Sequence, residues 1–146
     1  MRIIIDADAT PKNAKLICEQ LAKKYELELI MVIDNAHELT GDFKVIKVDK
    51  GKDSVDLEIV KISKNEDIII TQDYGLATIL IEKVYAVIHP KGMRYTKFNI
   101  ESLMFQRHMG QKMRNAGKRT KGPKKRERKD DQLFEENLMK ILKEYF

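Results

Sequence analysis

Five aspartates in three short segments of the chain have a type and spacing that could bind divalent metal ions. The segments read IIIDAD, GKDSVD and IIITQD, and in two of them a run of three isoleucines comes shortly before a carboxylate. Clustered carboxylates repel one another unless they are protonated or bound to cations, and oxygen-rich clusters suit Mg²⁺ or Mn²⁺. The candidate catalytic residues and metal ligands are Asp6, Asp8, Asp53, Asp56 and Asp73.

The positions of these aspartates along the chain predict that they converge. A short apolar run bounded by polar residues is typical of a buried parallel strand, and open α/β sheets bind ligands outside the carboxyl ends of their strands. Asp6, Asp8 and Asp73 follow such runs. Asp53 and Asp56 are three residues apart in a segment that continues as a helix, so they share one face. We therefore expect one metal-dependent site at the carboxyl edge of a sheet.

Each aspartate also has a purely structural explanation. Asp6 and Asp8 could end a strand and hold a turn, because Asp bonds its own backbone two residues on. Asp53 could cap a helix, with Asp56 in the first turn favoured by the helix dipole. Asp73 could cap the helix after its strand. The functional explanation is favoured because three separate segments place acid at the same predicted edge.

The elements that would position these residues alternate between strand and helix. The expected strands span residues 2–5, 27–33, 44–48, 67–71 and 84–88. The expected helices span about 11–25, 53–64, 74–83, 100–115 and 131–144. Thr10 and Asn99 are the expected caps of the first and fourth helices. Short alternation of this kind predicts an α/β fold with a mainly parallel sheet of four or five strands, followed by C-terminal helices.

A chain of 146 residues is long enough for one domain with a core and an appendage. We assign residues 1–106 to the α/β domain, 107–129 to a basic segment and 130–146 to a C-terminal helix. That helix carries an apolar stripe expected to pack on the domain. The stripe consists of Phe134, Leu138, Ile141 and Tyr145.

The basic segment is the strongest charge feature of the chain. Residues 107–129 hold eleven Lys and Arg and one acid, Glu127, a net charge of +10 within a total of +5. This asymmetry favours a nucleic-acid partner, although a solvated connector would have a similar composition. No aromatic residue lies between Phe105 and Phe134, so phosphate contact is expected rather than base stacking. The candidate nucleic-acid-binding residues are Arg107, Lys112, Arg114, Lys118, Arg119, Lys121, Lys124, Lys125 and Arg126.

Other classes of protein are disfavoured by what the sequence lacks. A single cysteine, Cys18, permits no intrachain disulfide and favours a reducing compartment. The apolar runs are too short for a membrane span, and the first residues have carboxylates where a signal peptide would be apolar. No Gly-rich phosphate loop, zinc-type spacing or Ser-His-Asp arrangement is found. We expect a cytoplasmic protein with no membrane partner.

Four motifs in order resemble the YaiI/YqxD family, uncharacterised bacterial proteins grouped with the PIN-like nuclease fold. The motifs are IIIDADATPKN, GKDSVDLEI, IIITQDYGLA and RNAGKRTKGPKK followed by DDQLF. The resemblance implies a PIN-like three-layer fold in which acids hold divalent metal at the carboxyl edge of a small parallel sheet. Asp6 matches the first-strand acid and Asp73 a late-strand acid, while Asp53 and Asp56 match less closely. Thr10 stands where family members commonly have cysteine.

The resemblance and the charge pattern together suggest a metal-dependent nuclease that hydrolyses phosphodiester bonds, with RNA the favoured substrate. Asp6 and Asp73 would bind Mg²⁺ or Mn²⁺ directly. Asp8, Asp53 or Asp56 would complete a second metal position or orient the attacking water. Lysines and arginines of the basic segment would hold the phosphate backbone.

Two alternatives remain. DADAT is also a D-x-D-x-T motif, which resembles the first motif of haloacid-dehalogenase-type phosphohydrolases, with Asp6 as nucleophile and Asp8 as general acid. Thr71 ends a later strand, as that group requires, but the order of the remaining acids differs and no matching lysine strand is found. The other alternative is a PIN-like module that binds RNA without cutting it, its acids serving only as caps.

Overall fold

The sheet has the parallel architecture that the sequence predicts. A computed structural model describes residues 1–146 except 35–37, 52 and 120–123. Its strands are β1 (Arg2–Asp6), β2 (Glu28–Asp34), β3 (Lys44–Val48), β4 (Ile68–Ile70) and β5 (Ala86–Ile88). They form one five-stranded sheet in the order β3-β2-β1-β4-β5, and every neighbouring pair is parallel. β1 and β4, which lead into Asp6 and Asp73, are therefore direct neighbours.

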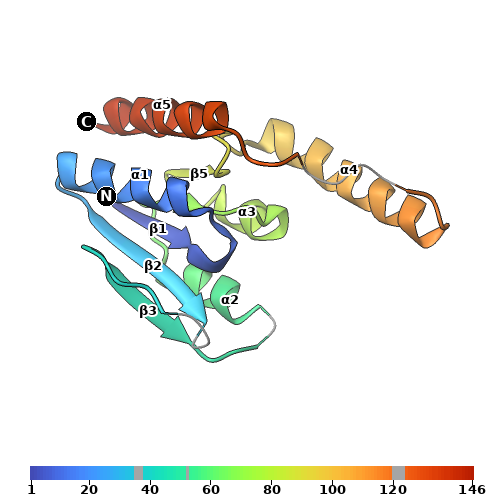
Figure 1. Ribbon diagram of the computed structural model, residues 1–146, viewed down its shortest axis with the longest axis horizontal. Coiled ribbons are helices and arrows are strands. Elements are labelled where there is room, and N and C mark those ends of the chain that lie inside the picture. The colour runs from blue at the N-terminus through green and yellow to red at the C-terminus, as the bar shows by residue number, and fades with distance from the viewer. Residues whose placement is uncertain (35–37, 52, 120–123) are drawn as a thin grey trace.

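Helices cover both faces of the sheet and give the expected three-layer α/β fold (Figure 1). A short 3₁₀ turn, η1 (Ala7–Ala9), follows β1. The α-helices in the described residues are α1 (Lys12–Lys24), α2 (Ser54–Ile62), α3 (Tyr74–Leu80), α4 (Lys97–Asn115) and α5 (Arg128–Tyr145). α1 and α5 pack on one face, and α2 and α3 on the other.

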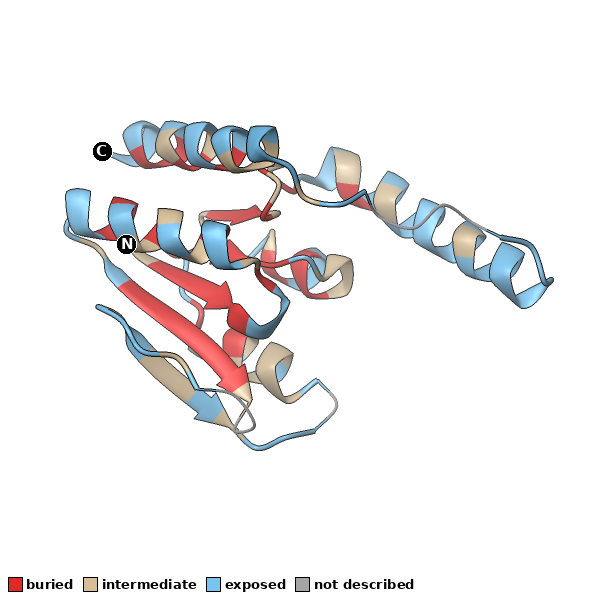
Figure 2. Cartoon of the chain, in the orientation of Figure 1, coloured by how far each residue is buried: buried red, intermediate tan, exposed pale blue. Residues whose placement is uncertain are grey.

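The isoleucine runs build both halves of the core because successive strand residues point to opposite faces. Ile3 and Ile5 join the cluster under α1 and α5, whereas Ile4 joins the cluster under α2 and α3. All three are fully buried, and the inner strands are buried along most of their length in Figure 2. Burial on both faces explains why these strands are continuous apolar runs rather than alternating ones.

α5 packs on the domain through its apolar stripe. Phe134, Leu138 and Ile141 are buried together with Cys18 of α1. Complete burial of each large apolar side chain is worth about 1.5–3 kcal/mol. The apolar surroundings also raise the pKa of the Cys18 thiol, so it is held as the unreactive thiol.

α4 begins earlier than the sequence indicated and then leaves the body of the protein. Its cap is Thr96, not Asn99: the Thr96 hydroxyl accepts from the Asn99 N–H at 3.2 Å, and the Asn99 side chain accepts from the Thr96 N–H at 2.9 Å. Such a capping box satisfies two backbone donors, whereas Asn99 alone would satisfy one. Ile100 is the buried residue of α4, and its later turns project away from the sheet (Figures 1 and 2).

The predicted cap of α1 was also wrong. Thr10 precedes the helix, but its hydroxyl donates to the Asp6 carbonyl at 2.7 Å, and Pro11 is the N-cap. The reason is the η1 turn after β1, which brings the buried Thr10 side chain back over the end of that strand. In the described residues no helix is long and apolar enough to span a membrane.

Candidate active site

Aspartates from three segments gather at the carboxyl edge of the sheet. Asp6 is the last residue of β1, Asp73 lies between β4 and α3, and Asp56 lies in the first turn of α2. The negative charges of Asp73 and Asp8 act on Asp6, and those of Asp73, Asp6 and Asp53 act on Asp56. All five candidate aspartates therefore belong to one electrostatically connected cluster.

Asp6 is the most buried member of this cluster. The residue is 6% exposed, and one carboxylate oxygen accepts a hydrogen bond from the Thr71 hydroxyl at 3.0 Å. Burial raises the pKa of Asp6 to about 6, the Thr71 bond lowers it, and the charges of Asp73 and Asp8 raise it further. The fold thus retains a carboxylate at a position where its negative charge is costly without a nearby cation.

Asp73 caps helix α3 and also belongs to the acidic cluster. Its Oδ1 accepts from the N–H groups of Gly75 and Leu76, at 2.8 and 3.2 Å, and so caps α3. Its own N–H donates to the Thr71 hydroxyl at 3.0 Å. The structural explanation of Asp73 as a cap is therefore correct, but the capping bonds use only one of its two carboxylate oxygens.

Asp56 faces Asp73 across the edge of the sheet. Burial raises the pKa of Asp56 to about 7, and the next largest cause is a hydrogen bond with the Asp73 side chain. Burial and the neighbouring negative charges of Asp73, Asp6 and Asp53 all disfavour the ionised form of the Asp56 carboxyl. The Asp56 carboxyl is therefore only partly ionised at neutral pH.

Asp8 and Asp53 lie at the exposed margin of the cluster. One Asp8 carboxylate oxygen accepts from the Asp34 N–H at 3.0 Å, which connects η1 to the end of β2. Asp53 occupies the N-cap position of α2 with φ 63°, but its side chain makes no capping hydrogen bond. Helix capping therefore does not account for the carboxylate at position 53.

The cluster consists of carboxylate oxygens, the donor atoms that Mg²⁺ and Mn²⁺ prefer. In the part of the chain that the structure describes, no three His, Cys, Asp or Glu side chains are arranged so that they could hold a metal ion as they stand. Mg²⁺, however, keeps several waters and is commonly bound by only one or two carboxylates together with substrate phosphates. Burial and neighbouring negative charge raise the pKa of both Asp6 and Asp56, so a cation between these side chains would relieve their repulsion.

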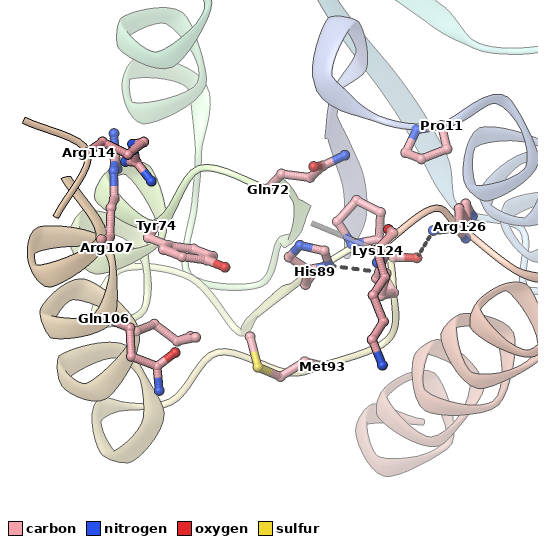
Figure 3. A pocket seen from close by; sticks show the side chains of 14 residues that line it. Pro11, Gln72, Tyr74, His89, Met93, Gln106, Arg107, Arg114, Lys124 and Arg126 are labelled. Atoms are coloured by element: carbon pink, nitrogen blue, oxygen red, sulfur yellow. Dashed lines mark hydrogen bonds between the residues drawn. The ribbon is translucent and has the colours of Figure 1, made fainter. Parts of the chain in front are cut away.

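Part of the basic segment lies next to this cluster. Arg107 and Arg114 of α4, with Lys124 and Arg126 of the stretch before α5, line a cavity that also includes Gln72 and Tyr74, the neighbours of Asp73 (Figure 3). Other predicted nucleic-acid-binding residues are exposed but are not among the residues that line this cavity, namely Lys112, Lys118, Arg119 and Lys125. Lys121 lies outside the described residues.

Comparison with known proteins decides the family. A family model described as "Uncharacterized BCR, YaiI/YqxD family" matches residues 4–144. The chain belongs to the YaiI/YqxD family. Its match covers the acidic cluster, α4 and every strand and helix of the sheet layers except the first two residues of β1 and the last residue of α5.

Similar YaiI/YqxD-type chains occur in several bacteria. A "UPF0178 protein" of Ruminiclostridium cellulolyticum is 43% identical over 144 residues, covering 98% of this chain and 93% of the relative. The UPF0178 protein of Lachnoclostridium phytofermentans is 42% identical and covers 98% of this chain and 97% of its own length. That of Natranaerobius thermophilus is also 42% identical and covers 97% of this chain and 96% of its own length. No solved structure matches the chain.

The sequence did not predict every residue of this YaiI/YqxD site. Thr71 was considered only for the phosphohydrolase motif, yet its hydroxyl joins Asp6 to Asp73. Its signal was a hydroxyl residue directly after an isoleucine run and two residues before an acid. Tyr74 lines the cavity from α3, whereas His89 and Met93 come from the turn after β5, so no local pattern could have grouped Tyr74 with them.

Proposed function

We propose that this protein is a divalent-cation-dependent nuclease that hydrolyses phosphodiester bonds, with single-stranded RNA as the favoured substrate. The observation that carries the proposal is the meeting of Asp6, Asp56 and Asp73 at the carboxyl edge of the sheet, where two of them have raised pKa values. Perturbed acids beside a cavity are typical of working sites. Membership of the YaiI/YqxD family is compatible with this activity.

In this proposal Asp6 and Asp73 bind Mg²⁺ or Mn²⁺ through the oxygens that their structural hydrogen bonds leave available. When bound, the cation would activate water for attack and stabilise the charge that develops on the phosphate oxygens. Thr71 fixes the orientation of the Asp6 carboxylate, since its hydroxyl donates to Asp6 and accepts from the Asp73 N–H. Asp56 orients the attacking water, with Asp53 and Asp8 adding negative charge at the margin.

The basic residues supply the other half of the proposed site. Arg107, Arg114, Lys124 and Arg126 lie on the cavity beside Asp73 and carry charge opposite to that of the acidic cluster. A phosphate backbone on these cations would bring neighbouring phosphates to the acids without any reading of base sequence. RNA is favoured through the resemblance to PIN-like nucleases.

A cleavage assay tests this function directly. A 5′-labelled single-stranded oligoribonucleotide is incubated with the full chain and Mn²⁺, and products are separated on a denaturing gel beside the DNA oligomer of the same sequence. We expect Asp6→Asn to reduce the rate at least a hundredfold, since it removes the most buried carboxylate of the cluster. Unchanged circular dichroism would show that the variant is folded.

Asp42→Asn is the matched control for this assay. Asp42 is an exposed aspartate just before β3, at the opposite edge of the sheet, where it pairs with Lys23 at 3.4 Å. The same loss of one carboxylate there should leave the cleavage rate within twofold. Full activity of a folded Asp6→Asn variant would overturn the proposal. So would the absence of cleavage by the wild type both with Mn²⁺ and with Mg²⁺ in its place.

A second candidate is a module that binds RNA without cutting it. It is favoured by the absence, in the described residues, of three acids already arranged around a metal position, and by the capping role of Asp73. It predicts that Asp6→Asn leaves RNA binding and every cellular function unchanged. Under the nuclease proposal the same variant still binds RNA but no longer cleaves it.

A further inference from the structure

A cavity of about 910 Å³ opens beside the acidic cluster. Tyr74 and Gln72 form one part of its wall, α4 contributes Leu103 and Arg107, and Lys124 of the stretch before α5 closes the opposite side (Figure 3). The volume is within the range of about 300–1,000 Å³ that is typical of sites for small ligands. It is large enough for one unit of a polymer substrate.

Every charged side chain that lines the cavity is a lysine or an arginine, although Arg126 is paired with Asp131. None of its described lining residues is an acid, although the acidic cluster begins one residue away, at Asp73. Such a wall attracts anions and concentrates them by its field. The lining cations are Lys91, Arg107, Arg114, Lys124 and Arg126.

The wall carrying Lys124 is held in place by hydrogen bonds. Lys91 Nζ donates to the Lys124 carbonyl at 2.9 Å, and Arg126 Nη1 donates to the Pro90 carbonyl at 2.7 Å. Arg126 Nε also donates to Asp131 at 2.7 Å. The stretch before α5 is thus bonded to the turn after β5, which makes the cavity a built feature of the fold.

Apolar and aromatic side chains line the remainder of the cavity. Tyr74, Met93 and Leu103 reach it, and the Tyr74 ring packs edge-on against Tyr95, with centroids 6.0 Å apart. Tyr95 is buried and its hydroxyl donates to the Thr71 carbonyl at 3.1 Å. The Tyr74 ring is therefore supported from the same strand end that positions the acids. A site for bare phosphate would need no such surface, whereas a nucleobase would.

His89 adds a fixed hydrogen-bond donor. Its Nδ1 accepts from the Lys91 N–H at 3.0 Å, so the proton of the neutral ring is assigned to Nε2. Burial, with the charges of Lys91 and Arg126, lowers the pKa of His89 to about 4. The ring is neutral at pH 7 and offers one N–H to a ligand in the cavity.

We propose that this cavity binds one nucleotide of a single-stranded nucleic acid, with its base against Tyr74 and Met93 and its phosphate on Arg107 and Lys124. The inference rests on the proposed function for the place of the next phosphate, which would lie at the acidic cluster. Duplex substrates are disfavoured because a paired and stacked base would first have to be flipped out of the helix, which costs unpairing and unstacking energy. The cavity would therefore select single strands by shape rather than by sequence.

Titration of the metal-free full chain with mononucleotides tests this inference apart from cleavage. Uridine 5′-monophosphate, ribose 5-phosphate and inorganic phosphate are added separately at low salt, and binding is followed by protein NMR. We expect uridine 5′-monophosphate to bind at least fivefold more tightly than ribose 5-phosphate, with the largest shifts at Tyr74 and His89. Equal binding of all three compounds would mean an anion site only and would overturn the inference.

Matched variants locate the ligand. Tyr74→Leu should weaken binding of uridine 5′-monophosphate about five- to twentyfold and leave ribose 5-phosphate unaffected, whereas Tyr145→Leu at the end of α5 should change neither. Arg107→Ala should weaken the binding of both compounds, and Lys143→Ala, at an exposed position of α5, should weaken the binding of neither. An unaffected Tyr74→Leu variant would contradict the inference.

Nucleotide binding without Mn²⁺-dependent cleavage would contradict the proposed function alone, and cleavage without nucleotide binding would contradict the cavity inference alone.

Discussion

The Thr71 hydroxyl donates a hydrogen bond of 3.0 Å to the Asp6 carboxylate and accepts one from the Asp73 N–H at the same distance. β1 and β4 are parallel neighbours, so residues just after their carboxyl ends meet directly. One buried hydroxyl thus connects the first acid of the site to the last. It also couples the ends of two strands that lie more than sixty residues apart in the sequence.

Replacing Thr71 by valine should damage the site through Asp6. The change keeps the side-chain shape but removes the donor to Asp6 and the acceptor for the Asp73 N–H, both at a buried position. We expect a loss of about 1–3 kcal/mol in the free energy of unfolding and weaker Mn²⁺ binding. Urea denaturation and calorimetry measure the two effects. Thr71→Ser, which restores the hydroxyl, should recover most of the Mn²⁺ affinity; if it does not, the hydroxyl has no positioning role.

Raising the pH should destabilise the metal-free protein through Asp6. Its folded pKa is raised from 3.8 to about 6, mainly by burial, so the folded state binds more protons than the unfolded state between these values. This contribution to stability is complete below pH 4 and is lost as the pH rises through 6. The decline in unfolding free energy from pH 5 to pH 8 should therefore be about 1 kcal/mol smaller in Asp6→Asn than in the wild type. An equal decline in urea denaturation of both proteins would disprove this origin.

A second buried aspartate at the opposite edge should affect stability without affecting the site. Asp67 is 1% exposed, and Arg2 donates to its two oxygens at 3.0 and 2.6 Å. Arg2→Met leaves this charge buried without its partner, so the unfolding free energy should fall by about 3 kcal/mol. Mn²⁺ affinity, measured below the unfolding transition, should stay within twofold. The double variant Arg2→Met, Asp67→Leu should recover most of the stability; a large change in Mn²⁺ affinity would contradict the separation of the two edges.

Salt should weaken RNA binding through the cavity cations. Each phosphate contact contributes about 0.7 to the slope of log affinity against log salt for single strands. Lys124→Ala, which removes one cation of the cavity, should reduce the slope by about that amount. Lys140→Ala, on an exposed position of α5, should leave it unchanged. Fluorescence anisotropy at four salt concentrations measures both slopes, and identical slopes would place the phosphate backbone elsewhere.

The sequence predicted the strands well because their signal is local. Three consecutive isoleucines before Asp6, and three before Thr71, can be buried on both faces only within a parallel sheet covered on both sides. The place of the acids then followed from the rule that ligands bind at the carboxyl ends of such strands. Asp6 and Asp73 did not have to be near each other in the chain for this prediction.

The errors arose where two residues compete for one local role. Thr96 and Asn99 are both good caps, and only their reciprocal hydrogen bonds show that Thr96 is the N-cap and Asn99 its partner. Thr10 has the right type for a cap, but the turn after β1 directs its hydroxyl to Asp6. The cavity could not be predicted at all, because Tyr74 enters it only through the packing of α4 beside α3.

Calorimetric titration with Mn²⁺ tests the central claim, that these acids form a divalent-cation site, most directly. The wild type is compared with the double variant Asp6→Asn, Asp73→Asn at matched pH and salt, with Asp42→Asn as control. Asn at position 73 still accepts the capping bonds of α3, so the variant should remain folded. We predict Mn²⁺ binding by the wild type and the control and none by the double variant. Absence of Mn²⁺ binding by the wild type, even with an oligonucleotide present, would contradict the account and leave the acids as structural residues.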